Sequence, residues 1–101
     1  MTVSIPNDTV TVLLAEDTSR TPAKAVWIQN LSTTVGFSLK AVVGHNDSAD
    51  AITIGEELYL GPAASATQPT TFMTDNPALV CARWLARQAS GGAVNLNVGR
   101  I

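Results

Sequence analysis

The chain has 101 residues, of which 46% are hydrophobic and 14% are charged, and its formal net charge is −2. This length predicts a single domain with its own core. The negative charge, with six Lys and Arg residues spread along the chain, argues against a nucleic-acid partner, and no apolar run approaches the roughly 18 residues of a membrane helix.

The N-terminal residues are predicted to form an unstructured segment that precedes the domain. It reads MTVSIPNDT and lacks the basic flank and apolar run of a secretory signal peptide, so we expect synthesis in a cytoplasm without export by that route. Cys81 is the single cysteine, so no internal disulfide can form, which suits a reducing compartment. Residues 1–8 contain Pro6 and are predicted to be a flexible N-terminal arm, followed by one domain at residues 9–101.

Alternation of apolar and polar residues predicts the first strands. Residues 9–14 place Val10, Val12 and Leu14 on one side of a strand, with threonines on the other. A loop then leads to residues 25–43, the clearest segment of the chain.

Residues 25–43 read as two strands joined by a short polar link. In the first strand Val26 and Ile28 occupy alternate positions, and in the second Phe37 and Leu39 do so. Three consecutive Ser and Thr residues and a glycine lie between them, which favours a reversal of the chain. The segment is therefore predicted to be a β-hairpin.

The middle of the chain predicts shorter strands. Residues 44–50 form a loop of turn-forming residues, and strands are expected at residues 51–54 and 58–60. After a connection rich in Ala, Ser, Thr and Pro, residues 70–74 are a candidate edge strand around Phe72.

Residues 76–90 carry signals for two structures. Asn76 is a possible helix N-cap, Pro77 suits the first helical position and Gly91 follows the end, which together favour a helix. The same residues also alternate as a strand would. We favour the strand, paired with residues 93–98 through the glycine turn between them.

Six or seven strands with Gly, Pro, Asn and Asp between them predict the fold class. The pattern is typical of an all-β protein, a small antiparallel β-sandwich or barrel of about six or seven strands. No alternation of strands and helices favours a parallel sheet.

The sequence offers few candidates for chemistry. His45 is the single histidine and lies in a polar loop, and Cys81 lies in an apolar run where an inert buried thiol is expected. Asp47 and Asp50, with Asn46, could supply oxygen ligands for calcium, but their spacing matches no EF-hand and such residues usually cap turns. We expect no metal and no cofactor.

Catalysis is also not expected. Glu56 and Glu57 are adjacent, so on a strand they would point to opposite faces and could not act as a carboxylate pair. No phosphate-binding glycine loop, nucleophile elbow or CxxC pair is present. The protein is therefore predicted not to be an enzyme.

The candidates for an interface are aromatic and basic side chains. Trp27 and Trp84 are expected mainly in the core, although an exposed Trp27 could stack on a sugar or anchor a partner. Arg83 and Arg87 would share a face and could bind carboxylates of a partner, or simply be solvated. The predicted interface comprises Arg83, Arg87, Trp27, Ile5 and Pro6.

The order of motifs along the chain resembles a known family. VWIQNLS, GEELYLGP, a strand ending in CARW, and ASGGAVNLNVGRI together resemble small β-sandwich virion proteins of tailed bacteriophages. The resemblance consists of an I-x-N strand end, a G-x-x-L-x-L turn and a C-terminal hairpin with glycines between its strands, and it covers most of residues 9–101.

The resemblance implies that the protein has a structural role in a larger assembly. Proteins of this kind serve as capsid decoration or cement proteins, which sit on the outer capsid surface and bridge major capsid protein subunits. It therefore implies a virion location, the major capsid protein as partner, and a homo-oligomer, with a trimer favoured. Alternatives are a head-fibre or tail-attachment module, or a glycan-binding module that uses Trp27 and the loop near His45. A small hydrolase is disfavoured by the missing acid–base residues.

Overall fold

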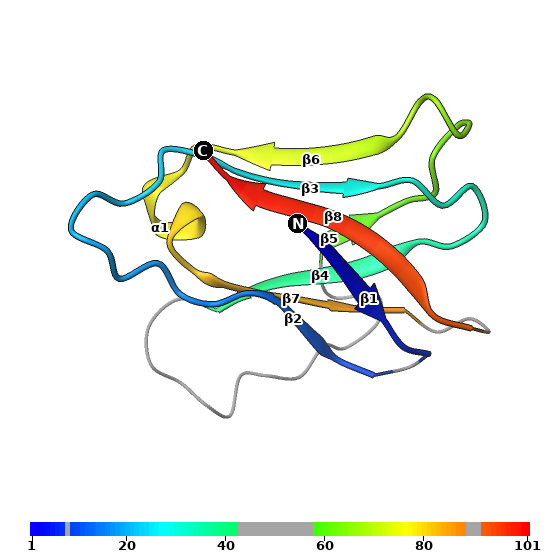
Figure 1. Ribbon diagram of the computed structural model, residues 1–101, viewed down its shortest axis with the longest axis horizontal. Coiled ribbons are helices and arrows are strands. Elements are labelled where there is room, and N and C mark those ends of the chain that lie inside the picture. Colours follow the sequence, from blue (N-terminus) through cyan, green and yellow to red (C-terminus); the bar gives the residue numbers. More distant parts are fainter. Residues whose placement is uncertain (8, 43–57, 89–91) are drawn as a thin grey trace.

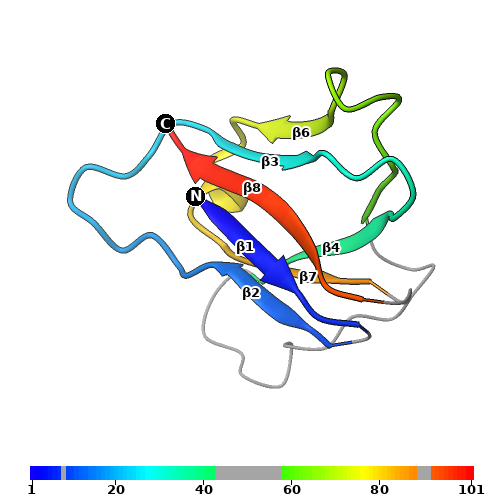
Figure 2. The same ribbon diagram turned by 45° about the vertical axis from the view of Figure 1, so that its right-hand side comes forward.

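The computed structural model describes residues 1–7, 9–42, 58–88 and 92–101 and shows two packed four-stranded antiparallel sheets (Figures 1 and 2). The first sheet has the strand order β1-β8-β3-β6 and the second has the order β2-β7-β4-β5. The elements are β1 (Thr2–Ile5), β2 (Thr11–Leu14), β3 (Val26–Asn30), β4 (Phe37–Val42), β5 (Leu58–Leu60), β6 (Thr70–Thr74), α1 (Pro77–Val80), β7 (Arg83–Arg87) and β8 (Val94–Arg100).

The core lies between the two sheets, as the predicted β-sandwich requires. Ile28 of β3 and Val98 of β8 are opposite each other and fully buried from the first sheet, and Phe37 and Leu39 are fully buried from the second. The predicted core position of Trp84 in β7 is confirmed, because this residue is 2% exposed. Its indole N–H donates to the carbonyl of Leu79 at 2.8 Å. The apolar positions that alternate in the sequence therefore build the core.

The N-terminal residues are part of the sheet, which corrects the expectation of a flexible arm at residues 1–8. Thr2–Ile5 pair with β8 in register, and Ile5 is fully buried. The amino group of Met1 also donates to the carbonyl of Val98 at 3.0 Å. Val3 and Ile5 alternate with Thr2 and Ser4, so a half-buried strand pattern was present here but was too short to stand out from a polar terminus.

Strand β2 faces the core with a different residue from the one expected. Val12 lies opposite Leu85, on the side of β7 away from Trp84, and is 47% exposed, whereas the next residue, Leu13, is in the core at 2% exposure. The register against β7 then shifts between Val12 and Leu14, so a β-bulge follows Val12 and does not determine which way Val12 faces. The predicted face, with Val12 inward, is therefore wrong.

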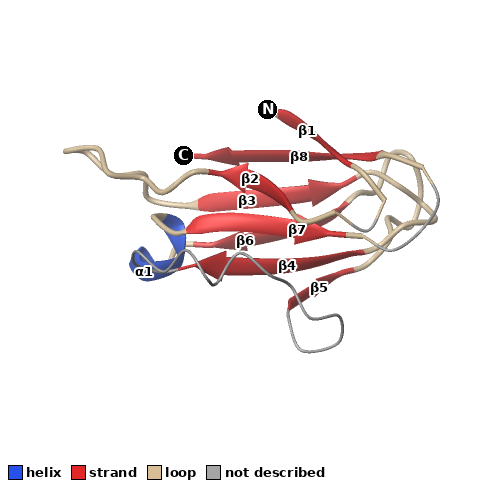
Figure 3. Cartoon of the chain, turned by 90° about the horizontal axis from the view of Figure 1, so that it is seen from below, coloured by secondary structure: helices blue, strands red, loops and turns tan. Residues whose placement is uncertain are grey.

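The link between β3 and β4 crosses from one sheet to the other, so the predicted hairpin is wrong. Strand β3 lies in the first sheet and β4 in the second (Figure 3). Buried Asn30 fixes the crossing: its side-chain amide donates to the carbonyls of Val35 (2.7 Å) and Gly61 (3.0 Å), and its oxygen accepts from the backbone N–H of Ser32 (2.9 Å). These bonds hold the turn residues in an arch between the layers.

Residues 76–88 contain both of the predicted structures in succession. Asn76 caps the single-turn helix α1 by accepting from the backbone N–H of Ala78, and Pro77 occupies the first turn, as the helix signals indicate. Strand β7 follows at Arg83–Arg87. It pairs with β2 and β4 of the second sheet, whereas β8 belongs to the first, so the predicted pairing of this segment with residues 93–98 is wrong. Part of the predicted turn, residues 89–91, lies outside the described residues.

Candidate interaction surfaces

The outer face of the first sheet carries a row of polar side chains that spans all four strands. Thr2, Asn97, Gln29 and Thr71 are in register across β1, β8, β3 and β6. The hydroxyl of Thr2 donates to Oδ1 of Asn97 (3.0 Å), Nδ2 of Asn97 donates to Oε1 of Gln29 (3.3 Å), and Nε2 of Gln29 donates to Oγ1 of Thr71 (3.4 Å). We call this row the polar ladder.

Trp27 lies on the same outer face, one row along from the polar ladder. It is half-buried because its indole covers Gly99, its partner across β3 and β8. An ideal Cβ atom at position 99 would lie 2.7 Å from Cζ2 of Trp27. Trp27 therefore lies on the surface of the sandwich. The prediction that places it mainly in the core is wrong.

No charged side chain points outward from the four strands of the first sheet. The alternate residues on this face are Thr2 and Ser4 of β1, Asn95, Asn97 and Gly99 of β8, Trp27 and Gln29 of β3, and Thr71 and Met73 of β6. A surface of amides, hydroxyls, one thioether and one indole does not repel a partner of either charge and costs less to desolvate than a charged surface. It is an uncharged candidate surface that extends over four described strands.

Arg83 and Arg87 share the outer face of the second sheet, as their spacing predicts. They are opposite Val42 and Ser38 of β4, on the side away from Trp84. Nη1 of Arg83 forms an ion pair with Oε1 of Glu16 at 3.1 Å, and the two side chains are 16% and 21% exposed. Arg83 therefore has a structural partner within the chain.

Ile5 and Pro6, the other predicted interface residues, differ in exposure. Ile5 is fully buried in the core and cannot contact a partner of the folded chain. Pro6 is exposed at the end of β1. The structure thus places Trp27 and the two arginines on opposite outer faces, and it does not bring the five predicted residues into one site.

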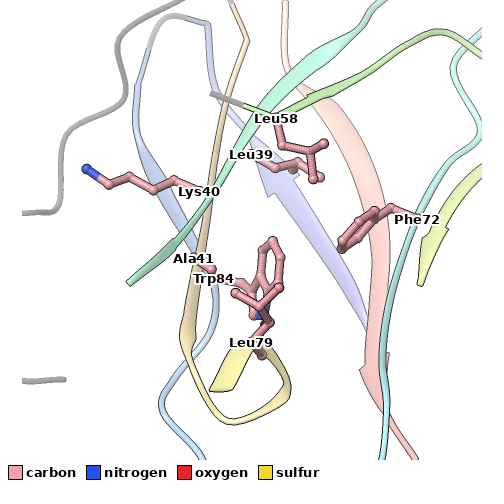
Figure 4. A pocket seen from close by; sticks show the side chains of 7 residues that line it. All are labelled: Leu39, Lys40, Ala41, Leu58, Phe72, Leu79 and Trp84. Carbon is pink, nitrogen blue, oxygen red and sulfur yellow. Dashed lines mark hydrogen bonds between the residues drawn. The ribbon is translucent and has the colours of Figure 1, made fainter. Parts of the chain in front are cut away.

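A second candidate surface lies where β5 and β6 meet at one border of the sandwich. A cavity of about 380 Å³ opens there, and Figure 4 shows Phe72, Leu58 and Trp84 directed toward one another while the side chain of Lys40 extends away. The rings of Phe72 and Trp84 are 5.5 Å apart at an interplanar angle of 54°. The lining residues are Leu39, Lys40, Ala41, Leu58, Phe72, Leu79 and Trp84.

Large apolar side chains are exposed at this same border. Leu58 and Tyr59 of β5 are 46% and 64% exposed, and Met73 of β6 is 59% exposed. Leu58 lines the cavity, whereas Tyr59 lies opposite Ser38 on the outer face of the second sheet and Met73 lies opposite Trp27 on the outer face of the first. The signal in the sequence was the run LYL, which alternation alone assigned to an ordinary strand.

Reactive groups do not assemble into a site in the described part of the chain. No group of three or more His, Cys, Asp or Glu side chains is placed to hold a metal ion there. Cys81 is half-buried just after α1. The calcium candidates Asn46, Asp47 and Asp50, together with His45, Glu56 and Glu57, lie outside the described residues, as does the predicted strand at residues 51–54.

Asp17 has the one clearly perturbed carboxyl among the described residues. The backbone N–H of Ala23 donates to Oδ2 at 2.9 Å, and the hydroxyl and N–H of Ser19 donate to Oδ1 at 2.7 and 3.1 Å. These hydrogen bonds, the one from Ala23 first, lower the pKa of Asp17 to about 2. Because all three donors belong to its own loop, the carboxylate organises the loop between β2 and β3.

Comparisons with known proteins leave the chain without a relative to guide the function. No family model, no curated protein and no solved structure matches it. In the part of the chain described by the structure, no helix is long and apolar enough to cross a membrane.

Proposed function

We propose that this chain is a structural virion protein of the decoration or cement type, which binds the outer capsid lattice and stabilises it by bridging major capsid protein subunits. The observation that carries the proposal is the uncharged outer face of the first sheet, together with the motifs that resemble phage virion proteins. The partners are the major capsid protein and further copies of this chain. The site of action is the capsid surface after synthesis in the host bacterial cytoplasm.

The polar ladder supports a docking role because it presents donors and acceptors in a fixed arrangement. The side-chain amides of Asn97 and Gln29 each donate one hydrogen bond to a neighbour in the polar ladder. Each amide retains a second N–H that can bind a partner. The side chains are thus ordered before binding, which lowers the entropic cost of association. On a lattice, many such contacts of modest strength act together.

The first experiment measures whether the chain is part of a virus particle. We expect it to co-purify with particles at a fixed ratio to the major shell subunit, and particles stripped of it to lose capsid integrity at a lower temperature. Absence from purified particles, or unchanged capsid stability after its removal, would refute the proposal.

A second experiment tests the docking face itself. Gln29→Lys with Asn95→Lys adds two charges to the outer face of the first sheet, away from its edges. We expect a folded domain that no longer binds stripped particles. Val12→Lys is the matched control, because Val12 is exposed on the second sheet and its replacement should leave binding unchanged. Equal binding by all three proteins would place the contact elsewhere.

A glycan-binding or head-fibre module remains the second candidate, and the position of Trp27 favours it. Gly99 leaves room for the indole to lie on the sheet beside the polar ladder, an arrangement on which a neutral sugar ring could stack. Since Trp84 is 2% exposed, a bound sugar would change the emission of Trp27. Titration with neutral oligosaccharides, with Trp27→Phe as control, tests this role, and an unchanged spectrum would exclude stacking there.

A further inference from the structure

Strand β6 (Thr70–Thr74) is an edge strand without the features that usually protect such edges. Its inner neighbour is β3, and among the described residues no strand pairs with its other side. Figures 1 and 2 show it at the border of the first sheet. Exposed edges present unpaired backbone donors and acceptors, and proteins usually block them with charge, proline, a bulge or a short strand.

The other three edges each carry such a block. Strand β1 has four residues and is followed directly by Pro6, β2 is interrupted by its bulge, and β5 is described over the three residues Leu58–Leu60. Strand β6 is flanked by Pro69 and Asp75, but it has five residues, TTFMT, with regular register against β3 and no charged residue or proline within the strand. It is therefore the longest unbroken edge among the described strands.

The sequence of β6 is complementary to itself in the antiparallel direction. A two-fold axis through Phe72 pairs the whole strand, with Thr70 opposite Thr74 of the second copy and Thr71 opposite Met73. Thr–Thr pairs and pairs of apolar residues stabilise neighbouring strands. Asp75, the nearest charge beyond the strand, would lie opposite Pro69 and meet no like charge.

Apolar side chains at this border would be covered by the same contact. Phe72 lines the cavity from the inner side of β6, and Leu58 of neighbouring β5 is exposed at its mouth. Pairing about Phe72 brings the two phenyl rings together and sets the two β5 strands near each other. The hydrogen bonds of the edge and the burial of Phe72 and Leu58 then favour association together.

We propose that two copies of this chain associate through antiparallel pairing of their β6 strands, which joins the two first sheets into one eight-stranded sheet. The partner at this edge is a second copy, because the register about Phe72 satisfies the complete strand in both copies at once. The proposal concerns the purified chain and does not depend on a role in a virus particle. It replaces the trimer favoured by the resemblance with a two-fold pair.

The register makes a sharp test possible, since Thr71 and Met73 are exposed on the outer face and face each other across the axis. Thr71→Lys with Met73→Lys places like charges opposite each other twice, and we expect dimerisation to weaken by about tenfold or more. Thr71→Glu with Met73→Lys places opposite charges together twice, so this variant should dimerise at least ten times more tightly than the double-lysine variant.

Sedimentation equilibrium over a range of concentrations measures the association, and circular dichroism shows that each variant is folded. Thr2→Lys with Ser4→Lys makes the same change on the other edge of the first sheet and should dimerise like the unmodified chain. A monomer at all concentrations, a trimer, or equal dimerisation of the two β6 variants would overturn the proposal.

Discussion

The indole of Trp27 occupies the space that a Cβ atom at position 99 would need, so Trp27 and Gly99 form one unit across β3 and β8. The contact lies on the outer face of the sheet, where nothing in the core requires it. It keeps a large aromatic ring beside the polar ladder. Glycine at this position is therefore required by the ring above it.

Gly99→Ala should disturb this unit. The added methyl group would lie 2.7 Å from Cζ2 of the indole, so the ring must move outward, and we expect a loss of about 1–3 kcal/mol in the free energy of unfolding. Urea unfolding measures the loss, and Trp27 emission should shift to the red. Gly61→Ala is the control, since its methyl group would meet Tyr59 Cε1 at an ordinary 3.7 Å. Equal stability of the two variants would contradict the contact.

Asn30→Ala should destabilise the arch between β3 and β4. The carbonyls of Val35 and Gly61 and the N–H of Ser32 would lose their partner in a buried place, so we expect a loss of about 2–4 kcal/mol in urea unfolding. Asn95→Ala removes the same side chain from an exposed position and should change stability little. An effect of Asn30→Ala no larger than that of Asn95→Ala would show that the arch does not depend on Asn30.

The fall in melting temperature at acidic pH, the acid limb of the stability curve, should depend on Asp17. Its pKa in the folded chain is about 2, below its ordinary value of 3.8, so the carboxylate stabilises the folded state above about pH 4. This contribution is lost as the pH falls from about 4 through 2. Asp17→Asn should therefore flatten the fall in melting temperature over that range. An unchanged acid limb would mean that the loop hydrogen bonds also form in the unfolded chain.

The ion pair between Arg83 and Glu16 should contribute little to stability. The two side chains are only 16% and 21% exposed, so solvent screens this pair less than a fully exposed one, and we expect a coupling of about 1 kcal/mol, the upper end for surface pairs. A double-mutant cycle with Arg83→Gln and Glu16→Gln measures the coupling free energy, which should decrease at high salt. A coupling well above that limit would identify Arg83 as a structural anchor and not a residue available for binding.

Local alternation predicted the strands, but the pairing of the strands depends on contacts that the sequence does not display. The strands containing Ile28, Phe37, Leu60 and Val98 are predicted because their apolar residues recur at every second position. Whether the chain reverses after Asn30 within one sheet or crosses to the other is decided by hydrogen bonds from Asn30 to Gly61, far along the chain. Turn-forming residues are compatible with both outcomes.

The candidate surfaces were only partly predictable for a similar reason. Arg83 and Arg87 share a face under any strand assignment, so that prediction is confirmed. The polar ladder joins Thr2, Gln29, Thr71 and Asn97 from four separate strands, and no spacing along the chain places them in one row. Ile5 is predicted at an interface, but it belongs to β1 and is fully buried.

The pairing of β1 with β8 has a consequence for biosynthesis. The first sheet joins Thr2–Ile5 to Val94–Arg100, and β8 also separates β1 from β3. While β8 is still inside the ribosomal tunnel, β1 has no neighbour and Ile5 has no complete core to enter. The nascent chain must therefore wait for β8 to emerge before this layer closes, a delay that long-range strand pairing generally imposes.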